Sequence, residues 1–177
     1  NDAIGESMFE GCTSLKKIEI PDTITSIGKR AFAGSGIKEI TSASLNNTII
    51  GEEMFAECPD LYSVYISSKI TKIGAGAFKG CSKLGQIVDN KQGVVTNDSN
   101  IWSNEMFKNC VGLTTITVNQ QDDLDKLGTN VFEGDNNLVS VTYYAKVIKS
   151  EMFKGCISLT NLSFEDETQN SYVTDIE

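Results

Sequence analysis

The chain has 177 residues, of which 40% are hydrophobic and 22% charged, a composition typical of a globular domain with enough apolar material for a core. Its formal net charge of -9 and pI near 4.6 disfavour nucleic acid and anionic membrane surfaces as partners, since both attract clusters of Lys and Arg. It has no histidine, which removes the commonest general base and metal ligand, and no apolar run long enough for direct membrane insertion.

One short pattern recurs along the whole chain, beginning near the N-terminus. Its anchor is phenylalanine, at spacings of 23, 23, 23, 29, 25 and 21 residues. The seven anchors are Phe9, Phe32, Phe55, Phe78, Phe107, Phe132 and Phe153. A fixed period of this length is the sequence signature of a repeat architecture, in which each unit stacks on its neighbours. We therefore expect one repeat domain of about seven units over residues 1–177, as a segment of a longer protein.

Other residue types keep a constant distance from the anchor. An apolar residue stands five positions before it, at Ile4, Ile27, Ile50, Ile73, Trp102, Leu127 and Ile148. All four methionines directly precede a phenylalanine, and all five cysteines follow one by three positions, at Cys12, Cys58, Cys81, Cys110 and Cys156. Ser35 and Asp135 take the cysteine position in the second and sixth units. Residues in phase with the phenylalanines are predicted to share their burial.

Each unit continues with a leucine or isoleucine and then an alternating stretch, such as LKKIEI from Leu15 or LYSVYI from Leu61. Alternation predicts a half-buried strand. The inward residues are Ile18 and Ile20, Val64 and Ile66, Ile116 and Val118, and Leu162 and Phe164. Pairs such as Ile24 with Ile27 predict a second, short extended segment. The GxxAFxxC stretch predicts a single helical turn, and the polar residues 89–100 a loop projecting from the fourth unit.

These residues resemble the BspA-type leucine-rich repeats, whose unit reads IGxxAFxxCxxLxxIxIPxxVxx. The clearest copy is IGESMFEGCTSLKKIEIPDTITSIG, which starts at Ile4 and has Pro21 at the family's proline position. The resemblance implies a leucine-rich-repeat solenoid: a right-handed superhelix with a parallel strand ladder on one face, and short extended segments and single helical turns elsewhere. It also implies display on a cell surface or secretion, with roles in adhesion or protein binding and no conserved catalytic site.

The cysteines stand at a fixed distance from the phenylalanine anchors, which favours buried, inert thiols over a nucleophile or a metal site. A disulfide between Cys58 and Cys81 stays open, since stacked units could bring them within range. Acidic or amide residues at 122–125 and 97–100 could offer oxygen ligands to calcium, although their spacing is more typical of solvated turns. The triplets at Asn46, Asn97 and Asn161 match a glycosylation acceptor only if the protein is secreted by a eukaryote. No cofactor is predicted.

Outward strand residues form two rows that define a candidate binding surface. The candidate ligand-binding residues are Lys17, Glu19, Glu39, Tyr65, Gln86, Val88, Thr115 and Thr117. Solenoids bind partners through such extended surfaces, and Tyr65 beside Val88 is the one semi-apolar pair. The leading hypothesis is a cell-surface or secreted module that binds a protein or glycan, host extracellular matrix included. The alternatives are an architectural spacer that presents another domain and, with least support, an enzyme using a thiol or carboxylate.

Overall fold

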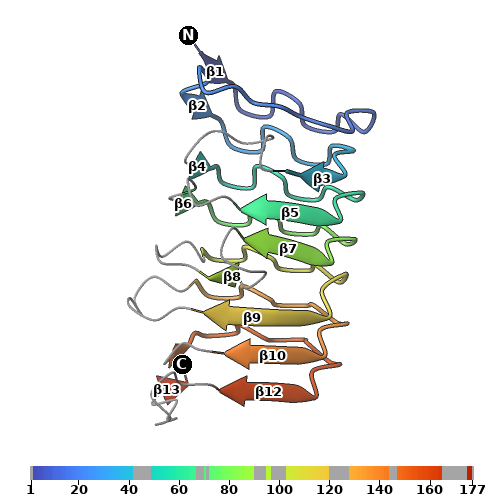
Figure 1. The fold of residues 1–177 in the computed structure, drawn as a ribbon, viewed down its shortest axis with the longest axis vertical. Coiled ribbons are helices and arrows are strands. Elements are labelled where there is room, and N and C mark those ends of the chain that lie inside the picture. Colours follow the sequence, from blue (N-terminus) through green and yellow to red (C-terminus); the bar gives the residue numbers. More distant parts are fainter. Residues whose placement is uncertain are drawn as a thin grey trace.

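The computed structural model describes residues 2–41, 49–66, 70, 72–89, 95–96, 103–119, 128–143, 147–164 and 175–176. Successive units stack along the long axis, with the N-terminus at one end of the stack (Figure 1). The strands of the main ladder are β3 (Glu39–Ile40), β5 (Ser63–Ile66), β7 (Gln86–Asp89), β9 (Thr115–Asn119), β10 (Ser140–Tyr143) and β12 (Asn161–Phe164). All pairings among them are parallel. The predicted parallel-strand solenoid is confirmed.

In the units where this stretch is described, short strands form the second extended segment. They are β1 (Ala3–Ile4), β2 (Ser26–Ile27), β4 (Ile49–Ile50), β6 (Lys72–Ile73), β11 (Val147–Ile148) and β13 (Asp175–Ile176). Each pairs in parallel with its counterpart in a neighbouring unit, so that Ile4 lies opposite Ile27 and Ile50 opposite Ile73. β4 and β6 lie to the side of the main ladder in Figure 1. The predicted second extended segment is therefore present.

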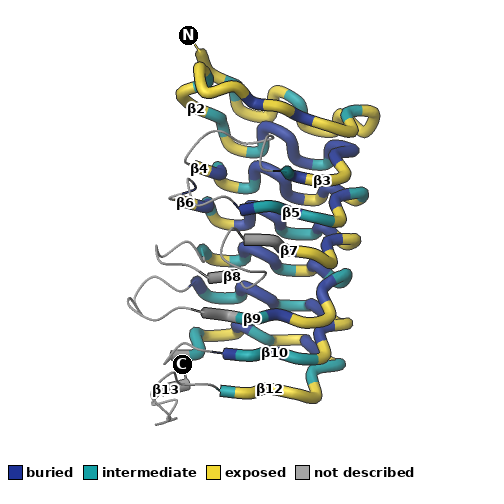
Figure 2. The backbone as a smooth tube through the Cα atoms, in the orientation of Figure 1, coloured by how far each residue is buried: buried dark blue, intermediate teal, exposed yellow. Residues whose placement is uncertain are grey.

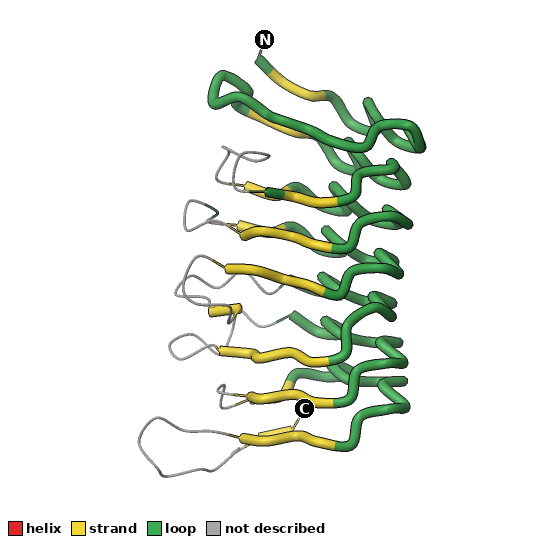
Figure 3. The backbone as a smooth tube through the Cα atoms, turned by 45° about the vertical axis from the view of Figure 1, so that its right-hand side comes forward, coloured by secondary structure: helices red, strands yellow, loops and turns green. Residues whose placement is uncertain are grey.

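Beside the phenylalanines the structure differs from the expected helical turn. Among the described residues there is no helix, and this part of each unit consists of consecutive β-turns (Figure 3). In the second unit Ala33 N–H donates to Arg30 O (3.0 Å) and Ser35 N–H donates to Phe32 O (3.2 Å). Arg30 and Gly34 have φ of 57° and 63°. A left-handed residue in every turn prevents a right-handed helix from continuing.

Bonds between units explain why these turns are preferred to a helix. Phe32 N–H donates to Met54 O of the next unit (3.0 Å), and Gly34 N–H donates to Ala56 O (2.8 Å). Every second N–H group of the turn segment is thus used between units, so it cannot form the i to i-4 bond that an α-helix needs. The main-chain hydrogen bonds between units therefore hold successive turn segments in the same conformation.

The core consists of rows of equivalent side chains that run along the axis. The seven phenylalanine rings stack nearly parallel, with centroids 5.2–5.9 Å apart. Buried residues line the interior of the stack, whereas the N-terminal unit is mostly exposed (Figure 2). Met8 is accordingly 55% exposed, and the equivalent Met54 is fully buried. In this structure an inner unit is covered by a neighbouring unit on both sides, and the first unit is covered on one side.

Most inward strand residues lie where the alternation placed them. Ile18, Ile20, Val64, Ile66 and Ile116 are buried, and the side chain of Val118 is outside the described part. In β12, however, Leu162 is 39% exposed and Phe164 is half-buried. The physical reason is position, because among the described strands β12 pairs with β10 alone. The alternating pattern predicts which side chains point inward, but an inward side chain is buried only where a neighbouring unit covers it.

Between the fourth and fifth units the main ladder is interrupted. Tyr62 N–H donates to Lys38 O (2.9 Å) and Val139 N–H to Thr114 O (2.8 Å), yet within the described residues no such bond joins Thr114 to Gly85. Instead β9 pairs with β8 (Val95–Thr96), which comes from the predicted loop. β8 lies between β7 and β9 in Figure 1. Two residues of that loop thus join the sheet, and positions 90–94 and 97–100 are outside the described part.

Candidate binding surface

We call the outward-pointing residues of the main ladder, together with the equivalent residues of the first unit, the strand face. Pairing places Glu39 opposite Ser63 and Ser63 opposite Gln86, and it places Tyr65 opposite Val88. Thr115 and Thr117 lie on β9, opposite Ser140 and Thr142 of β10. The first unit is irregular here, since Lys17 and Glu19 lie outside any strand and form an exposed ion pair at 2.7 Å. Within each sheet, the predicted rows of outward residues are therefore present.

The interruption divides the strand face into two plates. One plate is the three-stranded sheet β3-β5-β7, which holds Glu39, Tyr65, Gln86 and Val88. The other is the four-stranded sheet β12-β10-β9-β8, which holds Thr115 and Thr117. The predicted site residues are thus not one continuous surface. A partner that contacts both plates must cross the boundary between β7 and β9.

Uncharged polar groups dominate both plates. Ser63 Oγ donates to Gln86 Oε1 at 3.4 Å, and Ser163 Oγ donates to Thr142 Oγ1 at 3.5 Å. Glu39, Gln86 and Thr115 are exposed, whereas Tyr65 and Thr117 are half-buried. The side chain of Val88 is outside the described part, so the apolar pair with Tyr65 stays a prediction. Cross-strand hydroxyl and amide contacts of this kind leave much of their bonding capacity for a ligand.

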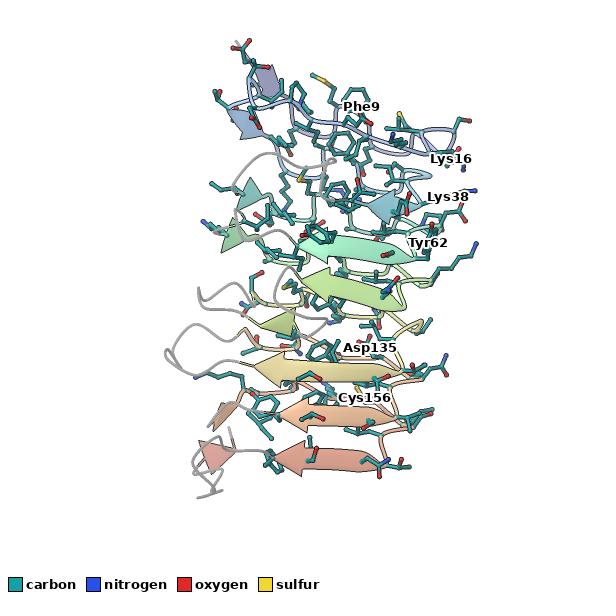
Figure 4. All side chains as sticks on the ribbon, in the orientation of Figure 1. Phe9, Lys16, Lys38, Tyr62, Asp135 and Cys156 are labelled. Carbon is teal, nitrogen blue, oxygen red and sulfur yellow. The ribbon has the colours of Figure 1, made fainter. Side chains whose placement is uncertain are left out.

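A further row of side chains, which the sequence reasoning missed, borders the strand face. This corner row consists of the residue directly before each ladder strand and the equivalent residue of the first unit. Its members are Lys16, Lys38, Tyr62, Gly85, Thr114, Val139 and Thr160. Lys16, Lys38 and Tyr62 lie one below another along one edge in Figure 4. Tyr62 is 47% exposed and Val139 is 41% exposed. The signal was available, because each of these residues directly follows the leucine position of its unit.

Tyr62 is fixed to the neighbouring unit by its hydroxyl group. The hydroxyl donates to Glu39 Oε2 at 3.2 Å, and this hydrogen bond raises the pKa of Tyr62 above its ordinary value. Close by, Asp60 pairs with Lys83 at 2.8 Å and with Lys16 at 3.4 Å. The hydrogen bond from Lys83 is the main reason that the pKa of Asp60 is lowered. Around Tyr62, the corner row thus places an exposed aromatic ring beside neighbouring charged groups of both signs.

The turn segments carry a different kind of surface, which we call the turn face. Its charges pair between successive units: Arg30 bonds Glu10 at 2.8 Å and also Glu53. Lys108 similarly pairs with Glu105 at 3.1 Å and Glu133 at 2.8 Å. Charges that bridge three units are already neutralised within the protein, although exposed pairs of this type add little stability each. The turn face is therefore less suited to charge-based recognition.

The cysteines are free thiols, so the structure has no disulfide between Cys58 and Cys81. Four of the five are buried as predicted, and Cys12 is exposed because it lies in the uncovered first unit. Burial raises the pKa of Cys110, and it raises that of Cys156 to about 11. Thiols of this kind are protonated at neutral pH and poorly nucleophilic. They act as packing elements of the core.

The remaining candidate ligand sites can be placed only in part. The segments 97–100 and 122–125, considered for calcium, lie outside the described residues, as does Asn46. Asn161 is exposed on β12. In the described part, no group of three Cys, Asp or Glu side chains is arranged to hold a metal ion. The same part of the chain contains no helix that is long and apolar enough to cross a membrane.

A parallel-strand solenoid with one stacked phenylalanine in each unit defines a repeat protein of the leucine-rich class. A sequence profile described as BspA type leucine rich repeat region matches residues 1–104 and 91–173, with six copies. The chain belongs to this family. A search of curated proteins found no similar sequence.

Solved structures with the same fold come from several bacteria. A leucine-rich cell surface protein from Faecalibacterium prausnitzii is 20% identical with a TM-score of 0.59, over 93% of this chain and 51% of that one. The pneumococcal vaccine antigen PcpA is 15% identical with a TM-score of 0.61, over 94% and 49%. A leucine-rich repeat protein from Bacteroides ovatus is 21% identical with a TM-score of 0.54, over 98% and 56%. The chain thus spans about half the length of these proteins.

Proposed function

We propose that this protein is an interaction module displayed on a cell surface or secreted, and that it binds a protein or a glycan through the strand face and the corner row. The observation that carries the proposal is the contrast between two surfaces. On the turn face the charges pair with one another, whereas the strand face and corner row present exposed hydroxyl, amide and aromatic groups. Exposed Tyr side chains are enriched among residues that dominate binding energy.

The expected site is centred on the plate β3-β5-β7. There Tyr62, Glu39 and Gln86 lie on consecutive rungs, and Gly85 adds no side chain next to Tyr62. Strands of one sheet are about 4.8 Å apart, so a ligand the size of two sugar rings or a short peptide could contact all three residues. We propose Thr115 and Thr117 as a second contact region, reached by ligands that extend over the other plate.

Cell-surface location is supported by what the structural neighbours are called. One is described as a cell surface protein and another as a vaccine antigen, and the family suggests protein interaction or adhesion. The family and the neighbours are repeat proteins, which supports the expectation that the chain is not an enzyme. The continuous phenylalanine stack supports a single repeat domain over the chain.

A binding screen with matched variants tests the proposal. The protein is immobilised and presented with extracellular matrix proteins and a glycan array, alongside Tyr62→Ala and the turn-face control Glu57→Ala. Loss of a tyrosine anchor is expected to weaken any specific binding by about 10-fold or more, equivalent to at least ~1.4 kcal/mol, and the control to leave it unchanged. No binding to any ligand would favour the spacer alternative, and binding that both variants retain would contradict a site centred on Tyr62.

A further inference from the structure

Asp135 is a buried carboxyl group in the row that cysteine thiols occupy in most other units. It is fully buried, and it lies in the core one rung before Cys156 (Figure 4). In four units the thiol of this row donates to the carbonyl oxygen of the phenylalanine one unit earlier. These bonds join Cys58 to Phe32 O (3.3 Å), Cys81 to Phe55 O (3.1 Å), Cys110 to Phe78 O (3.1 Å) and Cys156 to Phe132 O (3.1 Å). In these four units the row therefore supplies a hydrogen-bond donor to the main chain of the preceding unit.

Only half of the Asp135 carboxyl group is satisfied by the protein. Oδ1 accepts the main-chain N–H of Cys110 at 2.7 Å, whereas Oδ2 is buried without a partner. An ionised carboxylate can only accept hydrogen bonds, so it cannot take the donor role of a thiol. A protonated carboxyl group has one O–H and can. Leaving a charged oxygen buried and unpaired is among the costliest arrangements in a core.

The surroundings of Asp135 contain no compensating cation in the described part of the chain. The titratable groups that face it are the thiols of Cys110 and Cys156, one on each adjoining unit. The nearby turn-face charges of Glu133 and Lys108 are paired with each other at 2.8 Å. Burial raises the pKa of Asp135 to about 8, opposed only by the Cys110 N–H bond.

We propose that Asp135 is a proton-carrying position of the core, with a neutral carboxyl group in the folded protein whose Oδ2–H replaces the thiol as a donor toward the main chain of the fifth unit. Loss of this proton places an unpaired charge between units and loosens their stacking. β10 follows Asp135 by only five residues, so the plate β12-β10-β9-β8 of the strand face responds to pH with it. This group would therefore make the solenoid more stable at acidic pH than at alkaline pH.

The sign of the effect follows from proton linkage. The pKa of the Asp135 carboxyl group is about 8 in the folded protein, compared with an ordinary pKa of 3.8. Between these values the folded protein holds a proton that the unfolded chain has released, so stability falls as pH rises and levels off above the folded pKa. One such proton lowers the folding equilibrium constant by about tenfold per pH unit. Most carboxyl groups that are ionised and paired in the folded state have the opposite effect.

Two substitutions separate this group from the other acidic residues of the chain. Asp135→Cys restores the residue type of the row, and Asp135→Asn keeps the shape without an ionisable proton. Urea unfolding of all three proteins is measured at pH 5.5, 6.5 and 7.5. From pH 5.5 to 7.5 the folding equilibrium constant of the natural protein is expected to fall about 100-fold relative to either variant. An identical pH dependence in all three proteins would overturn the proposal.

A direct titration keeps the proposal testable even if both variants fold poorly. The 13C resonance of the Asp135 carboxyl carbon is followed by NMR in the natural protein, from pH 4 upwards. A midpoint near 8 is expected, well separated from the exposed carboxyl groups of the chain. A 13C shift showing that the Asp135 carboxyl group is already ionised at pH 6 would contradict the proposal.

Discussion

The thiol of Cys81 donates a hydrogen bond to the carbonyl oxygen of Phe55, 26 residues earlier, at 3.1 Å. The contact joins the cysteine row to the phenylalanine row of the core, and it recurs with other cysteine and phenylalanine pairs. Phe55 and Cys81 are both fully buried. The four buried cysteines thus do more than fill space, because each donates a hydrogen bond to a buried carbonyl group of the preceding unit.

Replacing Cys81 should therefore cost more than replacing a surface thiol. Cys81→Ala removes a buried sulfur atom and leaves the Phe55 carbonyl without this donor, for an expected loss of about 1–3 kcal/mol in the free energy of unfolding. Cys12→Ala is the matched control, since it has the same repeat position and an exposed side chain. Urea denaturation should show a change below about 0.5 kcal/mol for the control. Equal losses for both would argue against the inter-unit bond.

Thiol labelling gives an independent measure of burial. In the folded protein a thiol-specific reagent should modify Cys12 quickly and the four buried cysteines slowly, because burial limits access and raises the pKa of Cys110 and Cys156. Mass spectrometry should count one label at first and five after denaturation. Rapid modification of more than one cysteine under native conditions would be inconsistent with this core.

The phenylalanine stack should be most sensitive in its centre. Phe78 is fully buried and stacks on both Phe55 (5.8 Å) and Phe107 (5.6 Å). We expect Phe78→Ala to lower the free energy of unfolding by about 3–5 kcal/mol. Phe9 stacks on one side only and is half-buried, so Phe9→Ala should cost clearly less. Thermal unfolding of the two variants measures the difference, and a similar loss for both would contradict it.

Two glycines at the same repeat position should respond oppositely to alanine. A Cβ atom on Gly74 would lie 2.4 Å from Glu52 N, whereas on Gly51 its nearest neighbour, Ile27 O, would be 3.5 Å away. Gly74→Ala forces the backbones of two units apart and should destabilise the fold by at least about 1–3 kcal/mol. Gly51→Ala should be neutral or stabilise by up to about 1 kcal/mol. Chemical denaturation of the pair tests whether close unit stacking selects glycine.

Glu57 occupies a left-handed turn position that most other units fill with glycine. Its φ is 57°, and the equivalent Gly34 and Gly80 have φ of 63° and 74°. Left-handed geometry costs a residue with a Cβ atom about 1–2 kcal/mol, so Glu57→Gly should stabilise the protein by about 0.5–1 kcal/mol after the added chain entropy. The control Glu57→Ala keeps the strained geometry. A rise in melting temperature for alanine but not glycine would refute this interpretation.

Much of the core could be predicted from the position of each residue within the repeat. Phe55, Met54, Cys58 and Leu61 were assigned to the interior by their period, and all four are fully buried. The corner row was overlooked, because Tyr62 and Val139 fall between the leucine anchor and the alternating strand. Exposure of Cys12 and Leu162 also escaped prediction, since a repeat pattern is the same in end units and inner units while their covering is not.

Residue periodicity is enough to predict a solenoid and the side chains that form its rows, because a unit that cannot bury its own apolar residues must stack on its neighbours. The main-chain hydrogen bonds between units, in contrast, are seen only in the three-dimensional structure. Phe32 N–H bonds Met54 O of the next unit, which turns a predicted helical turn into β-turns. β8 pairs with β9 in place of β7, which splits the strand face in two. Both features depend on main-chain hydrogen bonds between residues more than 20 positions apart, and the periodicity of side chains does not predict such bonds.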